Sequence, residues 1–456
     1  MNVKEYKISI IGAGLAGSLL SIYLAKRGYI VDVYERRADM RKFDTGGGRS
    51  INLALSVRGI HALKEVGLFD EIQKIAIPMY GRMVHPLKGE VNLQPYGKDD
   101  TEYINSVSRA ELNKLLMDMT EPDPNVQYYF NERCLGMNFE TNEVYFHNEE
   151  KDRNWTLEAG VVIATDGATS PVRMEMLKTP RFNFSQEYEN YGYKELTIPP
   201  GPDGKFLMEK NALHIWPRGS YMLIALPNLD GSYTVTLFLA YDEALGGKNS
   251  FEYLNSDERI REFFERNFPD AAELMPDLIE DFNANPTGSL ITVKCYPWSI
   301  DGKVTMLGDS CHAIVPFFGQ GMNAAFEDCV YLNEMIGLHE GSWDKIFDEY
   351  QKIRKPNTDA IADLAQENFI EMRDLVDDER FLLKKKIEKE LYKKHPDRFI
   401  PKYSMVTFMR IPYATALERG RIQENILSKL SEGMPEIENV DWVKADEMVN
   451  KSLEKL

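Results

Sequence analysis

Cysteine is scarce in this chain, which has four cysteines among 456 residues: Cys134, Cys295, Cys311 and Cys329. No two are spaced as Cys-x-x-Cys, so the sequence indicates neither a zinc site nor a thioredoxin-like redox pair. So few cysteines in so long a chain also argue against a disulfide scaffold. We therefore expect no metal and a reducing, cytoplasmic location.

Basic charge and long apolar runs are also lacking. The 54 Lys and Arg residues stand against 72 Asp and Glu residues, which leaves a net charge of −18. Nucleic-acid binding needs a basic footprint, so we expect no nucleic-acid partner. No stretch approaches the roughly 20 apolar residues that span a bilayer, so we expect no membrane partner either. The hydrophobic share of 43% and the charged share of 28% are typical of a globular protein.

A glycine motif stands near the amino end, between two apolar stretches. Residues 6–11 read as a buried strand, and Gly12-x-Gly14-x-x-Gly17, a helical pattern and a second strand ending at Glu35 follow. In such a unit the glycines permit a tight turn, close approach of a pyrophosphate and close packing of helix on strand. The helix N-terminus faces the phosphates, and Glu35 can accept hydrogen bonds from ribose hydroxyls. The unit predicts dinucleotide binding, without separating FAD from NAD(P).

Patterns further along the chain predict the remaining architecture. We expect a helix over 108–120, one strand over 137–147, an antiparallel meander over 214–240, a buried strand over 304–307 and mainly helix from Gly321 onward. Short aromatic and β-branched runs separated by turn residues are typical of a meander. The predicted class is α/β: a Rossmann-type nucleotide-binding domain interleaved with an antiparallel-sheet substrate domain, followed by a helical C-terminal region.

Two further motifs resemble those of the single-component class A flavin aromatic hydroxylases. One is Asp166-Gly167 in the run 164–173, and the other is Gly308-Asp309 in the run 304–312, which continues to Asn323. The resemblance implies FAD as cofactor, with NAD(P)H as a visiting reductant because no second β-α-β fingerprint follows. The implied cofactor-binding residues are Gly12, Gly14, Leu15, Ala16, Gly17, Glu35, Arg36, Leu53, Ala54, Arg109, Asp166, Gly308, Asp309, Gly319, Gly321, Met322 and Asn323.

The chemistry of these residues fits a flavin. Asp309, at a strand end, can bond ribityl hydroxyls, and Arg109 can contact the flavin chain. A helix that begins near Gly321 has free N–H groups and a dipole that can stabilise negative charge on a reduced flavin ring. His312 lies beside this motif and is interpreted as structural rather than as an acid or base, because oxygen transfer from a flavin needs no protein nucleophile.

Five further stretches are similar to the kynurenine 3-monooxygenase family: residues 47–59, 81–85, 316–321, 367–372 and 402–408. Kynurenine carries a carboxylate, an ammonium group and an aminophenyl ketone. An arginine can hold such a carboxylate through two parallel N–H bonds, and aromatic or Met side chains can wall the ring. The resemblance implies a substrate pocket formed by Arg82, Tyr96, Phe317, Phe318, Asn368, Glu371, Met372 and Tyr403.

The implied activity is that of an FAD-dependent monooxygenase. It would hydroxylate L-kynurenine to 3-hydroxy-L-kynurenine with NADPH and O2, through a flavin C4a-hydroperoxide, as a step of tryptophan catabolism toward NAD. No side chain is expected to be catalytic, because the flavin carries the chemistry. Two alternatives stay open: an FAD hydroxylase of another aromatic carboxylate or quinone precursor, which needs no amino-acid clamp, and a non-catalytic dinucleotide-fold binding protein, which would be colourless when purified.

The motifs also predict how the chain divides. The FAD-binding domain is expected to comprise residues 1–75, 105–180 and 290–340, and the substrate domain residues 76–104 and 181–289. Residues 341–456 form the helical region, which is expected to contribute to the substrate pocket. The small-molecule substrate is the expected partner; the formation of a homodimer and the docking site of NADPH are left open.

Overall fold

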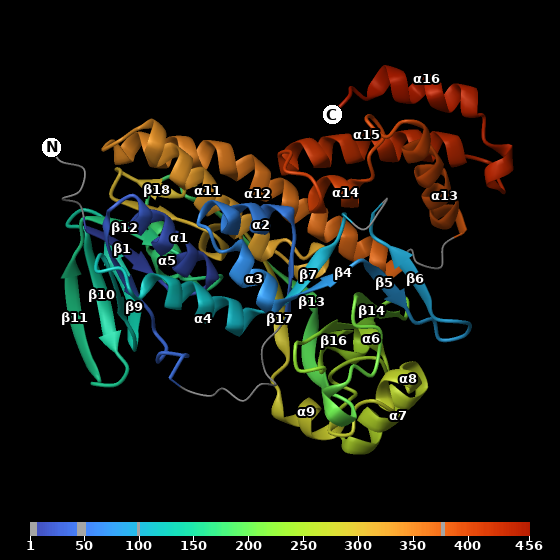
Figure 1. Ribbon diagram of the computed structural model, residues 1–456, viewed down its shortest axis with the longest axis horizontal. Helices are drawn as coiled ribbons and strands as arrows, with labels where there is room; N and C mark the ends of the chain where they lie inside the picture. Colours follow the sequence, from blue (N-terminus) through green and yellow to red (C-terminus); the bar gives the residue numbers. More distant parts are fainter. Residues whose placement is uncertain (1–6, 43–51, 98–100, 375–378) are drawn as a thin grey trace.

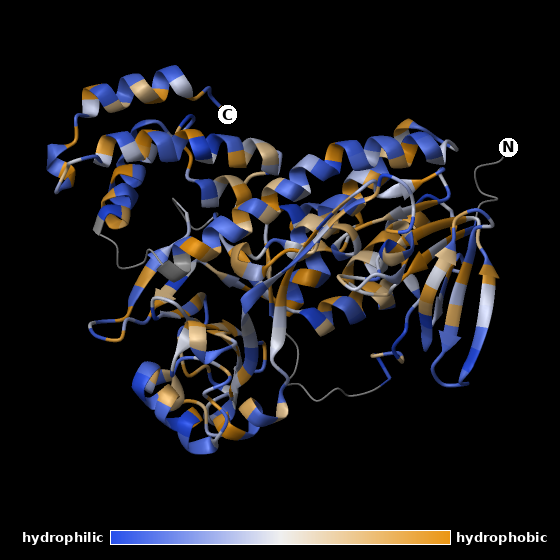
Figure 2. Ribbon diagram, turned by 180° about the vertical axis from the view of Figure 1, so that it is seen from behind, coloured by the Kyte–Doolittle hydropathy of each residue, from blue (hydrophilic) through white to orange (hydrophobic). Residues whose placement is uncertain are grey.

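The computed structural model describes residues 7–42, 52–97, 101–374 and 379–456 (Figure 1). One large sheet lies near the N-terminus, a second lies beside it, and helices α13 to α16 form a layer near the C-terminus. Figure 2 shows hydrophobic residues gathered in the interior strands of the first sheet, while the long C-terminal helices carry many hydrophilic residues. In the described part, no helix has the length and apolar character needed to cross a membrane.

The first sheet is mainly parallel. Its strands, in spatial order, are β18 (Ser299–Ile300), β19 (Val304–Met306), β12 (Val161–Ala164), β1 (Lys7–Ile11), β2 (Ile30–Tyr34) and β8 (Val126–Tyr129). Strand β1 pairs in parallel with β2 and β12, which places the loop after β1 at the carboxyl edge of the sheet. Strands of such sheets are buried on both faces and therefore read as continuous apolar runs rather than alternating ones.

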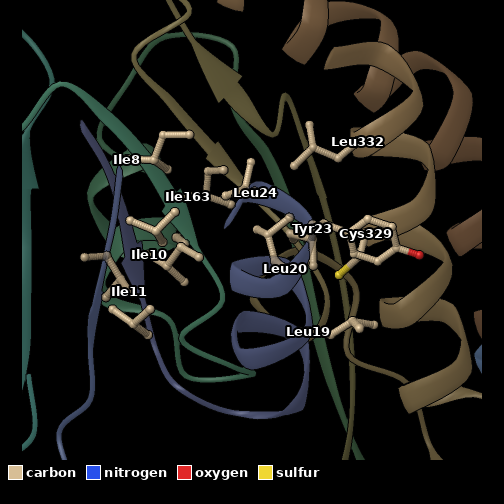
Figure 3. Packing of buried hydrophobic residues seen from close by; sticks show 14 of the residues in the cluster. Ile8, Ile10, Ile11, Leu19, Leu20, Tyr23, Leu24, Ile163, Cys329 and Leu332 are labelled. Atoms are coloured by element: carbon tan, nitrogen blue, oxygen red, sulfur yellow. The ribbon is translucent and has the colours of Figure 1, made fainter. Parts of the chain in front are cut away.

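Helix α1 (Leu15–Lys26) covers this sheet and is buried on nearly all sides. Figure 3 shows its side chains Leu19, Leu20, Tyr23 and Leu24 between the β1 isoleucines and the helix that carries Cys329 and Leu332. These side chains belong to one buried cluster. Because an all-round apolar helix must be enclosed on both sides, the packing fixes the glycine loop at its start.

The second sheet is mainly antiparallel. Its strands, in spatial order, are β17 (Gly288–Tyr296), β13 (Asn183–Ile198), β16 (Tyr233–Ala240), β15 (Met222–Pro227), β14 (Ala212–Pro217), β5 (Gly81–Val84) and β6 (Asn92–Pro95). Strands β5 and β6 enter it from an early part of the chain, and β14 pairs with β5 in parallel. Two separate segments of the chain therefore contribute strands to this sheet. This confirms the predicted interleaved α/β class with a helical C-terminal region.

Two small antiparallel sheets complete the strands. They are β3 (Asn52–Leu55), β7 (Ile104–Ser108) and β4 (Ala76–Met79), and β11 (Arg153–Glu158), β10 (Glu143–Asn148) and β9 (Glu132–Asn138). The α-helices other than α1 are α2 (Val57–Glu65), α3 (Phe69–Ile75), α4 (Arg109–Thr120), α5 (Pro171–Met176), α6 (Glu243–Gly246), α7 (Asp257–Asn267), α8 (Pro269–Ala272), α9 (Leu278–Ala284), α10 (Asp309–His312), α11 (Gly321–Leu338), α12 (Trp343–Asp374), α13 (Glu379–Lys394), α14 (Lys402–Thr407), α15 (Tyr413–Ser431) and α16 (Trp442–Ser452). The 3-10 helices are η2 (Pro202–Gly204), η3 (Pro316–Phe318) and η4 (Ile437–Asn439).

One predicted element is wrong. The strand expected over 137–147 is a hairpin, in which β9 ends at Asn138 and β10 begins at Glu143. The Asn138 side chain accepts a hydrogen bond from the Glu140 N–H at 2.9 Å, and Asn142 has a φ of 58°. Asn tolerates such a left-handed backbone and bonds its own turn, so polar local chemistry overrides the alternating pattern.

Buried charges hold the helices together behind the first sheet. Arg354 of α12 donates to Asp328 at 2.7 Å and to Glu327 at 2.6 Å, both on α11. Arg58 of α2 contacts the other Glu327 oxygen at 2.5 Å. Burial alone would raise the pKa of Asp328, but His312 and Arg354 lower it below its usual range. The cluster joins α2, α10, α11 and α12 at positions far apart in the sequence.

Replacing Arg354 with Met should therefore destabilise the fold strongly, since it removes one buried cation from two buried carboxylates and leaves Glu327 with Arg58 and Asp328 with His312. Loss of one partner from a buried pair costs about 3–5 kcal/mol. Lys352→Met is the matched control on the same helix, because its ion pair with Asp348 is exposed. Urea unfolding measures both free energies, and an Arg354→Met protein as stable as the control would contradict this account of the cluster.

Candidate functional site

Two large cavities meet at the carboxyl edge of the first sheet. One has a volume of about 730 Å³ and runs from Glu35 along α4. The other has a volume of about 450 Å³ and lies between α1, η3, the start of α11 and the second sheet. They share walls that include Gly14, Arg109 and Tyr193. Cavities of this size suit a cofactor or a small-molecule ligand.

The glycine loop after β1 has the shape that a dinucleotide requires. Gly12 has a φ of 106°, and a Cβ there would lie 2.7 Å from the Thr165 carbonyl oxygen. At Gly17 a Cβ would lie 2.0 Å from the Gly12 oxygen, so neither position admits a side chain. At Gly14, by contrast, a Cβ would meet no atom within 4 Å, and the residue lines both cavities. The backbone is thus open at the one glycine where a phosphate would approach.

The acidic residue at the end of β2 also lies at the first cavity. Glu35 accepts hydrogen bonds from the Ala13 N–H at 2.9 Å and the Arg37 N–H at 3.0 Å, which tie the glycine loop to β2. A carboxylate has further lone pairs for ribose hydroxyls. Arg37 lines the cavity, whereas the predicted cofactor residue Arg36 is exposed outside the lining.

The second cavity collects most of the predicted flavin residues. Leu15, Ala16, Leu53, Ala54, Arg109, Asp309, Gly319, Gly321 and Met322 all line it. Asn323 is buried behind the wall, where its side chain bonds the Ser56 N–H and the carbonyls of Ala54 and Gly319. Gly308, with a φ of 69°, donates its N–H to Asp328 at 3.1 Å, which anchors the turn that carries Asp309. These two predicted residues shape the cavity without forming its surface.

Asp166 does not reach either cavity wall. Its Oδ2 accepts a long bond from the Val172 N–H at 3.4 Å, and its Oδ1 is buried with no hydrogen-bond partner among the residues that the structure describes. Burial raises the pKa of this carboxyl to about 6, and bonds from Ser170 and Val172 only partly offset the effect. The neighbouring Thr165 and Gly167 line the second cavity in its place.

A cation lies among tyrosines at the far end of the second cavity. The Arg82 guanidinium, on β5, is 4.7 Å from the centre of the Tyr403 ring and 5.4 Å from that of Tyr96. Tyr403 in turn stacks on Tyr96 and Phe318, with ring centres 5.5 Å and 5.6 Å away. Among the described residues, no carboxylate lies within ion-pair distance of Arg82. The positively charged Arg82 guanidinium therefore faces the cavity, with aromatic rings packed beside it.

The remaining predicted substrate residues differ in where they lie. Phe317 lines the cavity, and Asn368 donates to the Phe317 carbonyl at 2.8 Å. Glu371 forms an ion pair with Lys402 at 3.1 Å, so its carboxylate is engaged away from the lining. The side chain of Met372 and residues 47–51 of the family-like stretch lie outside the described part of the chain.

The second sheet contributes a wall that the sequence motifs did not indicate. Tyr193, Ile215, Met222, Thr236 and Phe238 line the second cavity. They stand on strands whose inward positions depend on register with β16, and Phe238 packs on Phe317 with ring centres 5.1 Å apart. Alternate residues of the predicted meander strands face the same side of the sheet, so these wall residues could have been predicted once the buried side was known.

Comparison with known proteins shows which family this chain resembles. A family model described as "FAD binding domain" matches residues 5–365. A kynurenine 3-monooxygenase of Myxococcus xanthus is 49% identical over 98% of this chain and 95% of its own. The kynurenine 3-monooxygenase of Dictyostelium discoideum is 46% identical over 98% of each chain.

Solved structures share the fold at low identity. A tetrameric form of 2-methyl-3-hydroxypyridine-5-carboxylic acid oxygenase superposes with a TM-score of 0.65 at 18% identity, over 82% of this chain and 94% of its own. PqsL of P. aeruginosa, in complex with 2-aminobenzoylacetate, gives a TM-score of 0.65 at 19% identity, over 81% and 97%.

The open backbone at Gly14 leads to a specific expectation. Gly14→Val should fold normally but lose FAD, because the new side chain has room in the protein and occupies the cavity. Gly17→Val should fail to fold, because its side chain would overlap the Gly12 carbonyl. Circular dichroism and flavin absorbance separate the two results, and a folded, yellow Gly14→Val protein would show that the cofactor does not approach this glycine.

The buried carboxyl of Asp166 should make stability depend on pH. Its pKa of about 6 exceeds the value near 3.9 of an unfolded Asp, so between about pH 4 and 6 the unfolded chain loses its proton first. Wild-type stability should therefore fall by up to about 3 kcal/mol over this window relative to Asp166→Asn, and not change further above it. Urea unfolding at several pH values checks this, and a constant difference between the two proteins would refute it.

Proposed function

Since the chain belongs to the kynurenine 3-monooxygenase family, within the wider family that shares the FAD binding domain, we propose that it hydroxylates L-kynurenine to 3-hydroxy-L-kynurenine. NADPH and O2 are the proposed co-substrates. The proposal is supported most directly by Arg82, a cation that faces the second cavity beside two stacked tyrosine rings. Since none of the described residues offers it a carboxylate at ion-pair distance, Arg82 is suited to bind the carboxylate of a ligand.

The residues around both cavities fit FAD. The space in front of Gly14 accepts a pyrophosphate, Glu35 lies where a ribose would be, and the α11 N-terminus opens into the second cavity. When bound, FAD accepts hydride from NADPH and activates O2, so that one oxygen atom can reach the substrate ring. The proposed FAD-binding domain, residues 1–75, 105–180 and 290–340, contains the first sheet with α1, α4 and α11, and the proposed substrate domain, residues 76–104 and 181–289, supplies most of the second sheet.

The protein's own part in the reaction is to bind and orient. We propose that Arg82 holds the amino-acid carboxylate, while Phe317, Phe318 and Tyr403 hold the ring beside the flavin position. Attack on oxygen would occur at the carbon ortho to the ring amine, which already donates electron density there. No strong protein base is therefore required, in contrast to a reaction that must remove a phenolic proton. The aromatic wall also excludes water from the reacting edge.

The proposal also covers the cellular location of the enzyme. The four cysteines are unpaired thiols, and three of them are buried, which supports a reducing, cytoplasmic location. Homodimer formation stays open, and sedimentation equilibrium is the direct measurement of it.

The reaction is tested by reducing the FAD-loaded protein anaerobically with NADPH, with and without L-kynurenine, and then admitting air. We expect kynurenine to accelerate flavin reduction and the product to gain the mass of one oxygen atom. A product of unchanged mass would favour the hydroxylation of another aromatic acid, and a protein that takes up no FAD would favour a binding protein.

Arg82→Met tests the carboxylate site itself. Hydrogen bonds to charged groups contribute about 1.5–3 kcal/mol each, so the KM for kynurenine should rise about 100-fold while FAD content is unchanged. Kynuramine, which lacks the carboxylate, should bind wild type and variant about equally. Arg421→Met, at an exposed arginine, is the control. If the variant still prefers kynurenine over kynuramine, the carboxylate is bound elsewhere.

A further inference from the structure

A group of charges lies directly behind the aromatic wall of the second cavity. Lys402, the first residue of α14, donates to Glu367 at 2.9 Å and to Glu371 at 3.1 Å. Both carboxylates stand near the end of α12, one helical turn apart. The lysine side chain is only 21% exposed, and its stem lies over Gly420 of α15, where a Cβ would be 2.9 Å from the Lys402 Cδ.

The electrostatics favour a charged lysine at this place. Burial would lower the pKa of Lys402, but Glu371 and Glu367 outweigh it and raise the pKa. Partly buried ion pairs with two partners hold a helix more firmly than exposed single pairs, because the site is less screened by solvent. The start of α14 is thus fixed to α12 and to α15 together.

The next residue in the chain is Tyr403, which faces the cavity. Its ring stacks on Phe318 and on Tyr96 and lies against the Arg82 guanidinium. The end of α12 also fixes the opposite part of the wall, since Asn368 bonds the Phe317 carbonyl and Phe369 stacks on Phe317 at 4.1 Å. One stretch of α12 therefore sets both α14 and η3 against the cavity.

We infer that Lys402 is a positioning residue for substrate binding, which through its ion pairs with Glu367 and Glu371 holds Tyr403 against Arg82. Glu371 thereby supports the substrate site through its ion pair with Lys402, and its carboxylate does not line the cavity. The inference rests on the proposed function, because it concerns how the kynurenine carboxylate site is kept in shape. Arg82 is flexible at four torsions, and a fixed aromatic plane beside it limits the directions its N–H groups can take.

The test compares two lysines of similar burial. Lys402→Met keeps the stem over Gly420 and removes the charge. The control is Lys384→Met, since Lys384 is 18% exposed and joins α13 to Glu424 of α15, away from Tyr403. We expect Lys402→Met to raise the KM for L-kynurenine about tenfold, with kcat and FAD content within about twofold of wild type. Lys402→Arg should restore most of the affinity, and Lys384→Met should have a wild-type KM.

A second arm asks whether Lys402 acts through Tyr403. In a Tyr403→Ala background, Lys402→Met should cause little further rise in KM, because the ring that it positions is gone. Equal effects in both backgrounds, a normal KM in Lys402→Met, or an equal rise in Lys384→Met would each overturn the inference. Failure of wild type to bind and hydroxylate kynurenine would instead overturn the proposed function, so the two failures are distinguishable.

Discussion

The buried ion pairs between Arg58, Arg354, Glu327 and Asp328 are the constraint on which the rest of this structure depends. They lie on α2, α11 and α12, so they join segments separated by about 300 residues of chain. Asp328 also receives the Gly308 N–H, and Arg58 donates to the Ile411 carbonyl at 2.5 Å. The same cluster therefore fixes the turn that carries Asp309, the direction of α11 and the return of the C-terminal segment toward the cavity.

From that framework the site is assembled in two halves. The first sheet presents an open backbone at Gly14 and the start of α11, both suited to negative charge. The second sheet and η3 present an apolar surface that ends at one arginine. Because Tyr403 comes from α14, the C-terminal helices close the second cavity, although they lie beyond both sheets in the chain. The surrounding packing therefore fixes the position of the arginine and of the partial positive charge at the start of α11.

Local patterns made the nucleotide half predictable from sequence. Gly12, Gly14, Gly17 and Glu35 lie within one contiguous β-α-β unit, whose geometry is largely independent of distant contacts. The second-sheet wall was not predictable in this way, because the register of β13 on β16 decides whether Tyr193 or Lys194 faces the cavity. Arg37 rather than Arg36 lines the first cavity, because both residues lie in the turn after β2, which ends at Tyr34, and the turn sets the direction of their side chains. Glu371 was placed in the pocket by its motif, whereas the position of Lys402, 31 residues on, decides where its carboxylate lies.

A crystal structure of the FAD-loaded protein with L-kynurenine tests the central claim most directly. The account predicts the carboxylate within hydrogen-bond distance of the Arg82 guanidinium, with the stacked rings of Tyr96 and Tyr403 beside it and the aminophenyl ring between Phe317 and the flavin. A ligand whose carboxylate lies away from Arg82, or an Arg82 side chain turned out of the cavity, would contradict it.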